Sequence, residues 1–189
     1  EAFLIIDEAH ATGVFGPNGR GLAHFLEGAP NIITLHTCGK ALGVSGGLVC
    51  LSKTLKNFLI NRARNFIFAT APSPLIAACV RGALGYISEN DGRRCQLIAH
   101  IEHTKKCLSF LSYPGPTNSQ IQPIIIGSDA RALKLAKRLQ GQGYDIRAIR
   151  PPTVPEDSAR LRISVTLNVT ENQISEMSSC LRDLIEKEL

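Results

Sequence analysis

The stretch FLIIDEAHATG at the start of the chain constrains the fold more than any other part of the sequence. Its apolar residues 2–6 predict a buried β-strand, and Asp7 and His10 follow where that strand ends. In open α/β sheets, ligands bind beyond the carboxyl ends of the strands. The stretch therefore predicts a strand that presents a carboxylate and an imidazole to a ligand, and Glu8 is assigned no role.

The letters DEAH also occur in the acidic box of a group of helicases, where strand-end carboxylates hold Mg²⁺ beside ATP. Such an NTPase needs the phosphate-binding loop GxxxxGK, followed by Ser or Thr, ahead of its acidic box. Here Gly39 and Lys40 form the only Gly-Lys pair, and they come after the box. Ala41 then occupies the place of the Mg²⁺-binding hydroxyl. A DEAH-type NTPase is therefore only a remote alternative.

Composition limits the class of protein. Of the 189 residues, 44% are hydrophobic, which suits a globular protein with a core, and no apolar run is long enough for a membrane span. The net charge of +5 is not clustered and aromatic residues make up 5%, so no nucleic-acid surface is indicated. We expect a cytoplasmic protein with no nucleic-acid and no membrane partner. Because the chain begins on a core strand without Met, we also expect a piece of a longer protein.

The cysteines and histidines indicate no metal site. The six cysteines lack CxxC spacing and lie mostly in apolar segments, which predicts reduced, buried thiols. His100 and His103 have helical spacing, but no cysteine or carboxylate completes a ligand set beside them. We therefore expect these two histidines on a surface helix.

The pattern of apolar runs predicts an α/β chain with two parts. Residues 1–90 are expected to belong to a large domain with a mainly parallel sheet, and residues 91–189 to form a small α+β domain. The expected strands are 2–6, 32–36, 47–51, 66–69, 121–126, 144–149 and 161–167. The expected helices are 53–62, 75–88, 94–112, 129–140 and 170–188, with a Pro/Gly-rich loop at 113–118.

Four residues of the first part together predict a pyridoxal 5'-phosphate site. A carboxylate such as Asp7 can keep a pyridine nitrogen protonated, so that the ring withdraws electrons from a carbanion. His10 is close enough in sequence to reach the phenolic oxygen of the same ring. Lys40 lies in the glycine-rich loop TCGKALGVSGG, where its amine can bind a carbonyl cofactor covalently. Thr37 can donate its hydroxyl to the phosphate.

Three strings, IIDEAHATGVFGPNGRGL, HTCGKALGVSGG and IRPPTVPEDSARLRIS, resemble the α-oxoamine synthase family. Its members are fold-type-I pyridoxal-phosphate enzymes that condense an amino acid with an acyl thioester and release CO₂. The resemblance implies a fold-type-I transferase, of which this chain is the C-terminal part of the large domain plus the small domain. It covers about the C-terminal half of a typical member. The family's ring-stacking histidine and first phosphate-binding turn belong to the other half.

Carried over residue by residue, the resemblance implies the following cofactor contacts. Lys40 binds the cofactor covalently, Asp7 pairs with the pyridine nitrogen, and His10 contacts the 3' oxygen of the ring. Thr37 contacts the phosphate. Thr70, in the string FATAPSP, matches a position that reaches the phosphate in the partner subunit of a homodimer.

The resemblance also implies the substrates. Arg162 would hold the amino-acid carboxylate and Thr153 would contact the acyl substrate. The string IRPPTVP is most similar to the family member of the biotin pathway, which joins L-alanine to a pimeloyl thioester of coenzyme A or an acyl carrier protein. Other family members, namely 5-aminolevulinate synthase, 2-amino-3-ketobutyrate ligase and serine palmitoyltransferase, stay open, as does a non-catalytic subunit of the same fold. The sequence departs from the family at residues 167–169, which are Leu-Asn-Val where Ala-Ala-His is frequent.

Overall fold

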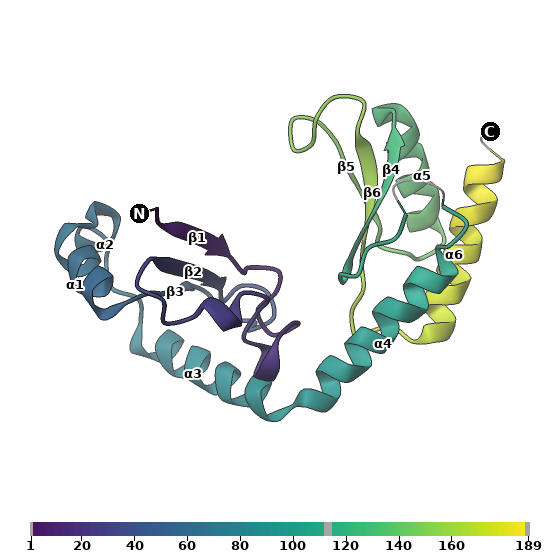
Figure 1. The fold of residues 1–189 in the computed structure, drawn as a ribbon. Helices are drawn as coiled ribbons and strands as arrows, with labels where there is room; N and C mark the ends of the chain where they lie inside the picture. Colours follow the sequence, from purple (N-terminus) through teal and green to yellow (C-terminus); the bar gives the residue numbers. More distant parts are fainter. Residues whose placement is uncertain (1, 112–114, 188–189) are drawn as a thin grey trace. The chain divides into compact units, whose positions relative to one another are not determined.

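The computed structural model describes residues 2–111 and 115–187 of the chain. The chain divides into two compact units, unit 1 (Glu1–Arg94) and unit 2 (Cys95–Leu189), and each is described by itself (Figure 1). The expected division into a large domain of residues 1–90 and a small domain of residues 91–189 stays a prediction. In the part of the chain that is described, no helix is long and apolar enough to cross a membrane.

Unit 1 contains a three-stranded sheet of β1 (Leu4–Asp7), β2 (Ile32–Thr37) and β3 (Gly47–Cys50), in the order β1-β2-β3. β1 pairs parallel to β2, and β3 pairs antiparallel to β2. The central strand β2 has the sequence IITLHT, whose β-branched residues suit a pleated strand between two neighbours. Because β1 and β2 run parallel, their carboxyl ends lie at the same edge of the sheet. Within this chain the sheet is therefore mixed, with one parallel and one antiparallel pair.

The connection from β1 to β2 consists of turns and two 3-10 helices, η1 (Pro17–Gly19) and η2 (His24–Leu26). Parallel strands are usually joined by an α-helix, but this segment is punctuated by glycine and proline. Gly21 has a φ of +104°, and a Cβ at this position would lie 2.8 Å from the carboxyl carbon of Glu8. Both the backbone conformation and the available space therefore require glycine here.

Three helices follow the sheet of unit 1: α1 (Lys53–Arg62), α2 (Arg64–Ile67) and α3 (Pro74–Glu89). The side chain of Ser52 caps α1 by accepting a hydrogen bond from the backbone N–H of Leu55 at 3.4 Å. The expected helices 53–62 and 75–88 are confirmed by α1 and α3.

The strand expected at residues 66–69 is wrong, because this segment takes part in α2 and the turn after it. The backbone N–H of Phe68 donates to the carbonyl of Arg64 at 3.0 Å, and that of Ile67 donates to Ala63 at 2.9 Å. These local bonds satisfy the backbone without a sheet neighbour. Aromatic and β-branched residues favour strands only where a sheet surface is available to pack against.

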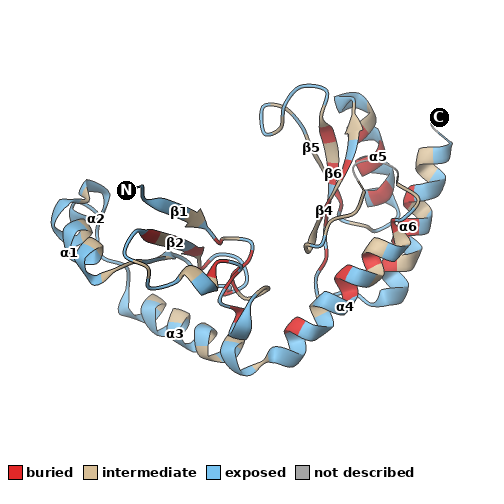
Figure 2. Cartoon of the chain, viewed as in Figure 1, coloured by how far each residue is buried: buried red, intermediate tan, exposed pale blue. Residues whose placement is uncertain are grey.

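Much of the apolar surface of unit 1 is exposed in this chain (Figure 2). The prediction of a buried strand at residues 2–6 is wrong in this respect, because Leu4 is 48% and Ile5 is 69% exposed. β1 has only one neighbouring strand, and none of its four residues is fully buried. The other large exposed apolar residues of the unit include Phe25, Phe58, Phe66, Phe68 and Leu75.

Unit 2 contains a second three-stranded sheet and helices packed on it. The elements are α4 (Asp91–Cys107, which begins at the end of unit 1), β4 (Ile121–Gly127), α5 (Asp129–Gly141), β5 (Arg147–Ile149), β6 (Ala159–Ser164) and α6 (Glu171–Glu186). The sheet order is β4-β6-β5, and both pairs are antiparallel. The strands expected at 144–149 and 161–167 are thus shorter or shifted, and the helix expected at 94–112 begins and ends earlier, as α4. The elements expected at 121–126, 129–140 and 170–188 lie close to their expected positions. The end of the helix expected at 170–188 and part of the loop expected at 113–118 lie outside the described residues.

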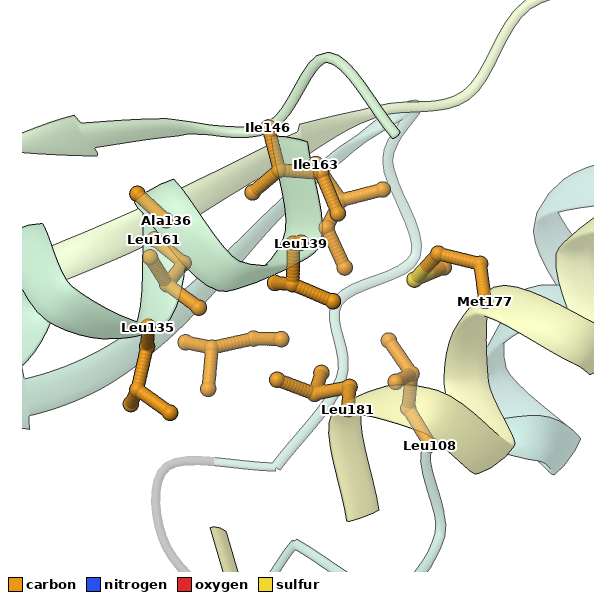
Figure 3. Packing of buried hydrophobic residues seen from close by; sticks show 10 residues of the cluster. Leu108, Leu135, Ala136, Leu139, Ile146, Leu161, Ile163, Met177 and Leu181 are labelled. Atoms are coloured by element: carbon orange, nitrogen blue, oxygen red, sulfur yellow. The ribbon is translucent and has the colours of Figure 1, made fainter. Parts of the chain in front are cut away.

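The core of unit 2 forms on one face of β6 (Figure 3). Leu161 and Ile163 point into the core, while the alternate residues Arg160, Arg162 and Ser164 point to the other face. Leucines of α5 and α6 pack against the inward face, and the fully buried members of this cluster are Leu108, Leu135, Leu139, Leu161 and Leu181. This cluster gives unit 2 a continuous apolar core.

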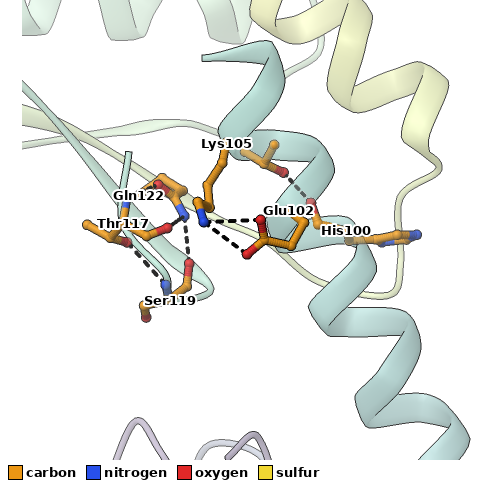
Figure 4. Close-up of polar contacts among 7 residues, drawn as sticks. His100, Glu102, Lys105, Thr117, Ser119 and Gln122 are labelled. Atoms are coloured by element: carbon orange, nitrogen blue, oxygen red, sulfur yellow. Dashed lines mark hydrogen bonds and ion pairs between the residues drawn. The ribbon is translucent and has the colours of Figure 1, made fainter. Parts of the chain in front are cut away.

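Three buried polar side chains of unit 2, those of His100, Thr104 and Gln122, are hydrogen-bonded to nearby backbone (Figure 4). Gln122 holds the turn before β4, because its Nε2 donates to the carbonyls of Thr117 at 2.9 Å and Ser119 at 2.6 Å. His100 is also buried, and its Nδ1 donates to the carbonyl of Thr166 at 3.2 Å. The expectation of a surface position is therefore wrong for His100, because this face of α4 packs against the segment between β6 and α6.

The cysteines are all free, but only Cys38 is fully buried. Cys50, Cys79 and Cys95 are exposed, so the prediction of buried thiols is wrong for half of the six. Cys50 and Cys79 belong to unit 1, whose apolar surface is largely exposed, and Cys95 is the first residue of unit 2. Apolar neighbours in sequence therefore do not by themselves imply burial.

We expect Leu135→Ala to lower the free energy of unfolding of unit 2 by about 2–5 kcal/mol, because it removes a fully buried side chain and leaves a cavity. The matched control is Leu133→Ala on the same helix, where the side chain is 45% exposed and the loss should stay below about 1 kcal/mol. Urea unfolding followed by circular dichroism measures both. Equal losses for the two variants would contradict the assignment of the core.

Candidate active site

Asp7 ends β1, and the turn that follows it carries His10. Oδ1 of Asp7 accepts a hydrogen bond from the backbone N–H of Ala9 at 2.8 Å, which fixes the orientation of this exposed carboxylate. The turn is closed by the carbonyl of Glu8, which accepts hydrogen bonds from the N–H groups of Ala11 and Thr12, both at 2.9 Å. The side chains of Asp7 and His10 are thus presented from a hydrogen-bonded turn rather than from a loose loop.

Lys40 lies in the closed loop between β2 and β3. The N–H of Cys38 donates to the carbonyl of Gly46 at 2.9 Å, and the N–H of Val44 donates back to the carbonyl of Cys38 at 2.9 Å. Gly46 has a φ of +112°, a conformation that favours glycine. Thr37, the last residue of β2, accepts a hydrogen bond at its Oγ1 from the N–H of Gly39 at 3.4 Å. The loop therefore holds the exposed Lys40 next to the end of β2.

The structure brings four of the seven predicted site residues to one place in unit 1. Asp7 and His10 follow β1, and Thr37 and Lys40 follow β2, so all four lie at the edge where these parallel strands end. Thr70 is exposed in the segment between α2 and α3 of the same unit. The two remaining predicted residues, Arg162 and Thr153, belong to unit 2.

Arg162 projects from the outer face of β6. It pairs with Arg147 across the sheet on one side and with Pro123 on the other. A cavity of about 560 Å³ opens beside it, lined in part by Arg147, Tyr144 and Met177. The hydrogen bond and charge of Asp145 raise the pKa of Arg147. Arg147 thus has an ion-pair partner at 2.6 Å.

Thr153 lies in the loop between β5 and β6, next to the peptide bond between Pro151 and Pro152, which is cis. Its backbone N–H donates to the carbonyl of Arg150 at 3.0 Å, which closes a turn. The side chain is exposed. The structure thus places Thr153 on an ordered loop that is available to a ligand.

Sequence reasoning missed Glu8, Thr12 and His36, which are buried beneath the site. Glu8 was given no role, and this was wrong, because its Oε1 accepts a hydrogen bond from the backbone N–H of Ala23 and so fixes the long connection to β2. A carboxylate directly after a strand-end Asp points to the opposite face of the chain, and this alternation could have indicated an inward position. Among the described residues, no group of three His, Cys, Asp or Glu side chains is placed to hold a metal ion.

The family model of aminotransferase class I and II matches residues 1–179 of the chain. A curated relative, 8-amino-7-oxononanoate synthase of Dechloromonas aromatica, is 41% identical over 97% of this chain and 48% of its own length. The chain therefore spans about half the length of the curated relatives it matches. These relatives confirm the expected resemblance to the α-oxoamine synthase family.

Solved structures also match over nearly the whole chain. The crystal structure of 8-amino-7-oxononanoate synthase from Francisella tularensis has a TM-score of 0.87 at 29% identity, and the match covers 97% of this chain and 55% of that one. A structure of SPT with PLP matches with a TM-score of 0.86 at 24% identity, over 98% of this chain and 48% of that one. The expected α/β fold of type I is confirmed by these matches.

Cys38, which lies between Thr37 and the lysine loop, should react with iodoacetamide at least about tenfold more slowly than Cys79 at pH 8. Burial raises the pKa of the Cys38 thiol, so less of the nucleophilic thiolate is present, and the buried sulfur is also shielded. Cys79 is exposed on α3 and serves as the internal control. Mass spectrometry of the alkylated peptides over time measures both rates, and equal rates would show that the loop is open.

Proposed function

The chain belongs to the aminotransferase class I and II family, and we propose that it is the C-terminal half of a pyridoxal-phosphate-dependent 8-amino-7-oxononanoate synthase. Such an enzyme joins L-alanine to a pimeloyl thioester and releases CO₂. The observation that carries this choice within the family is the 41% identity to a synthase of that name along almost the whole chain. Because the chain spans about half of that relative, the activity is proposed for this half of the fold together with the other half.

The groups at the edge of the first sheet suit pyridoxal phosphate. They include a carboxylate, an imidazole, a primary amine and a hydroxyl, which match its pyridine nitrogen, phenolic oxygen, aldehyde and phosphate. When bound, the cofactor withdraws electrons from the Cα of an amino acid. Asp7, whose Oδ1 is held by Ala9, would keep a proton on the pyridine nitrogen, and His10 would donate a hydrogen bond to the phenolic oxygen. Thr37 would contact the phosphate.

Lys40 would have two tasks. In the resting protein its amine would bind the cofactor covalently, and once displaced by L-alanine the same amine would remove the proton from Cα of the substrate. Its exposed position on a loop closed by backbone hydrogen bonds supports both tasks, since the amine can move while its backbone stays fixed. We assign Thr70 to the phosphate of the partner's site in a homodimer.

Arg162 would hold the carboxylate of the amino acid through its two-pronged guanidinium. This contact would orient the substrate so that the bond to be broken stands perpendicular to the cofactor ring. The anchored inner face of β6 supports this role, because Leu161 and Ile163 fix the strand from which Arg162 projects. Thr153 would contact the acyl chain of the thioester, which is carried by coenzyme A or an acyl carrier protein.

Lys40→Ala should abolish covalent attachment of pyridoxal phosphate after borohydride reduction, because no other group of the loop offers a primary amine. Peptide mass spectrometry should find the added cofactor on Lys40 in the unchanged protein. Lys53→Ala, at an exposed position on α1, is the matched control and should leave attachment unchanged. Reduction that fixes the cofactor to a different lysine in both variants would overturn the assignment of Lys40.

CO₂ release with L-alanine and pimeloyl coenzyme A tests the reaction, with glycine and L-serine as competing substrates. We expect L-alanine to be preferred, and we expect Arg162→Lys to raise the KM for L-alanine roughly 10- to 100-fold, since a lysine keeps the charge but loses the paired hydrogen bonds. Arg147→Lys, directly across the sheet, is the control and should change KM little. A preference for glycine or L-serine would point to another α-oxoamine synthase.

A further inference from the structure

A chain of buried polar side chains lies beneath the candidate site in unit 1. It consists of Thr12 in the turn after β1 and of Thr34 and His36 on β2. These side chains are only 6%, 2% and 7% exposed, respectively. Buried polar groups are costly unless each has a hydrogen-bond partner. The arrangement is therefore either fully bonded or a source of instability.

Counting protons shows that every member has a partner in one arrangement. The hydroxyl of Thr12 donates its single proton to the carbonyl of Glu8 at 2.8 Å. Thr12 Oγ1 lies 2.8 Å from His36 Nδ1 and can therefore only accept, so the proton must be on Nδ1. Nε2 of a neutral His36 then has a free lone pair, and it accepts from the hydroxyl of Thr34 at 3.0 Å.

This chain joins the two segments that carry the candidate site. Thr12 closes the turn that begins at Asp7 and contains His10, and His36 directly precedes Thr37 in the strand that leads to Lys40. The backbone ladder between β1 and β2 reaches the pair Asp7 and Leu35, and a further bond runs from the N–H of Glu8 to the carbonyl of Leu35 at 2.8 Å. The side-chain bond between Thr12 and His36 adds a directional contact beyond this ladder, between the turn itself and β2.

We propose that His36, as the neutral tautomer with its proton on Nδ1, is a positioning residue that fixes the Asp7–His10 turn relative to the Thr37–Lys40 loop through Thr12. The proposal rests on the proposed function, in which the turn and the loop hold pyridoxal phosphate. Asp7 and Lys40 must hold two ends of one small cofactor ring, so a shift of the turn against β2 changes the fit of both at once. His36 itself touches neither the cofactor nor the substrate.

The tautomer and the turn can be tested without any cofactor. In protein labelled with ¹⁵N-histidine, long-range ¹H–¹⁵N correlations should show His36 protonated at Nδ1 and not at Nε2. Thr12→Val keeps the shape of the side chain but removes its hydroxyl, and it should speed amide hydrogen exchange of Ala11 and residue 12 by roughly three- to tenfold, the size expected for one buried hydrogen bond. A His36 protonated at Nε2, or unchanged exchange in Thr12→Val, would overturn the proposal.

Two substitutions of His36 separate its two contacts. The amide of His36→Asn places a donor near the position of Nδ1 and should keep the bond to Thr12, whereas the amide of His36→Gln lies near Nε2 and should keep only the bond to Thr34. We therefore expect the dissociation constant for pyridoxal phosphate, measured by fluorescence titration, to rise roughly three- to tenfold in His36→Gln and Thr12→Val but to stay near the original value in His36→Asn. A ranking in which His36→Gln binds better than His36→Asn would overturn the proposal.

His100→Gln is the control for loss of a buried histidine contact elsewhere, since His100 belongs to unit 2 and bonds to Thr166 through Nδ1, which the amide of Gln does not replace. This control should lower the melting temperature without changing the affinity for pyridoxal phosphate. His36→Gln should also weaken the affinity, at a melting temperature similar to that of the control variant. Equal effects of both variants on stability alone would show that His36 is merely structural. If the unchanged protein binds no pyridoxal phosphate, the proposed function fails, while the tautomer and the exchange rates still decide whether His36 holds the turn.

Discussion

The parallel pairing of β1 with β2 is the constraint on which the candidate site depends. The register joins Leu4 to Ile32 and Asp7 to Leu35, so both strands end at one edge of the sheet. A four-residue strand spans roughly 13 Å, and an antiparallel β1 would therefore place Asp7 and Lys40 at opposite ends of the sheet. The long connection between the two strands contains no α-helix, and the polar contacts of Glu8 and His36 add to the backbone ladder that pairs the strands.

Of two residues adjacent in sequence, one presents a functional group at the candidate site and the other anchors the backbone beside it. Asp7 is exposed while Glu8 is buried and bonded to the backbone of Ala23. The same alternation places His36 inside while the next residue, Thr37, closes β2 at the edge of the site. Because successive side chains of an extended chain point to opposite faces, a residue that presents a functional group is followed or preceded by one that can anchor it. A substitution of Glu8 or His36 is therefore expected to disturb the neighbouring Asp7 or Thr37 as well.

Local helices and loops could be predicted from the sequence better than contacts between residues that are distant in sequence. The helix at 53–62 has its own cap and turn signals, and the strand and loop around Lys40 are marked by β-branched residues and glycine, so these needed no distant contacts. The aromatic segment at 66–69 was misjudged, because strand formation depends on a sheet neighbour that this segment lacks. Likewise, the bond between Thr12 and His36 joins residues 24 positions apart. No local pattern in one sequence indicates such a pair.

Different interactions hold the candidate site residues of the two units in place. Apolar packing supports Arg162 in unit 2, and hydrogen bonds support Asp7 in unit 1. Unit 2 presents Arg162 from a strand whose inner face is set in a leucine-rich core, and dense packing of that kind resists displacement in all directions. The buried apolar residues of unit 1 are fewer and mostly small, such as Ala11, Ala23 and Cys38. Hydrophobic burial is non-directional and could not fix a short turn by itself. Hydrogen bonds depend on distance and angle, so a polar interior is the more effective way to hold Asp7 in place against the lysine loop.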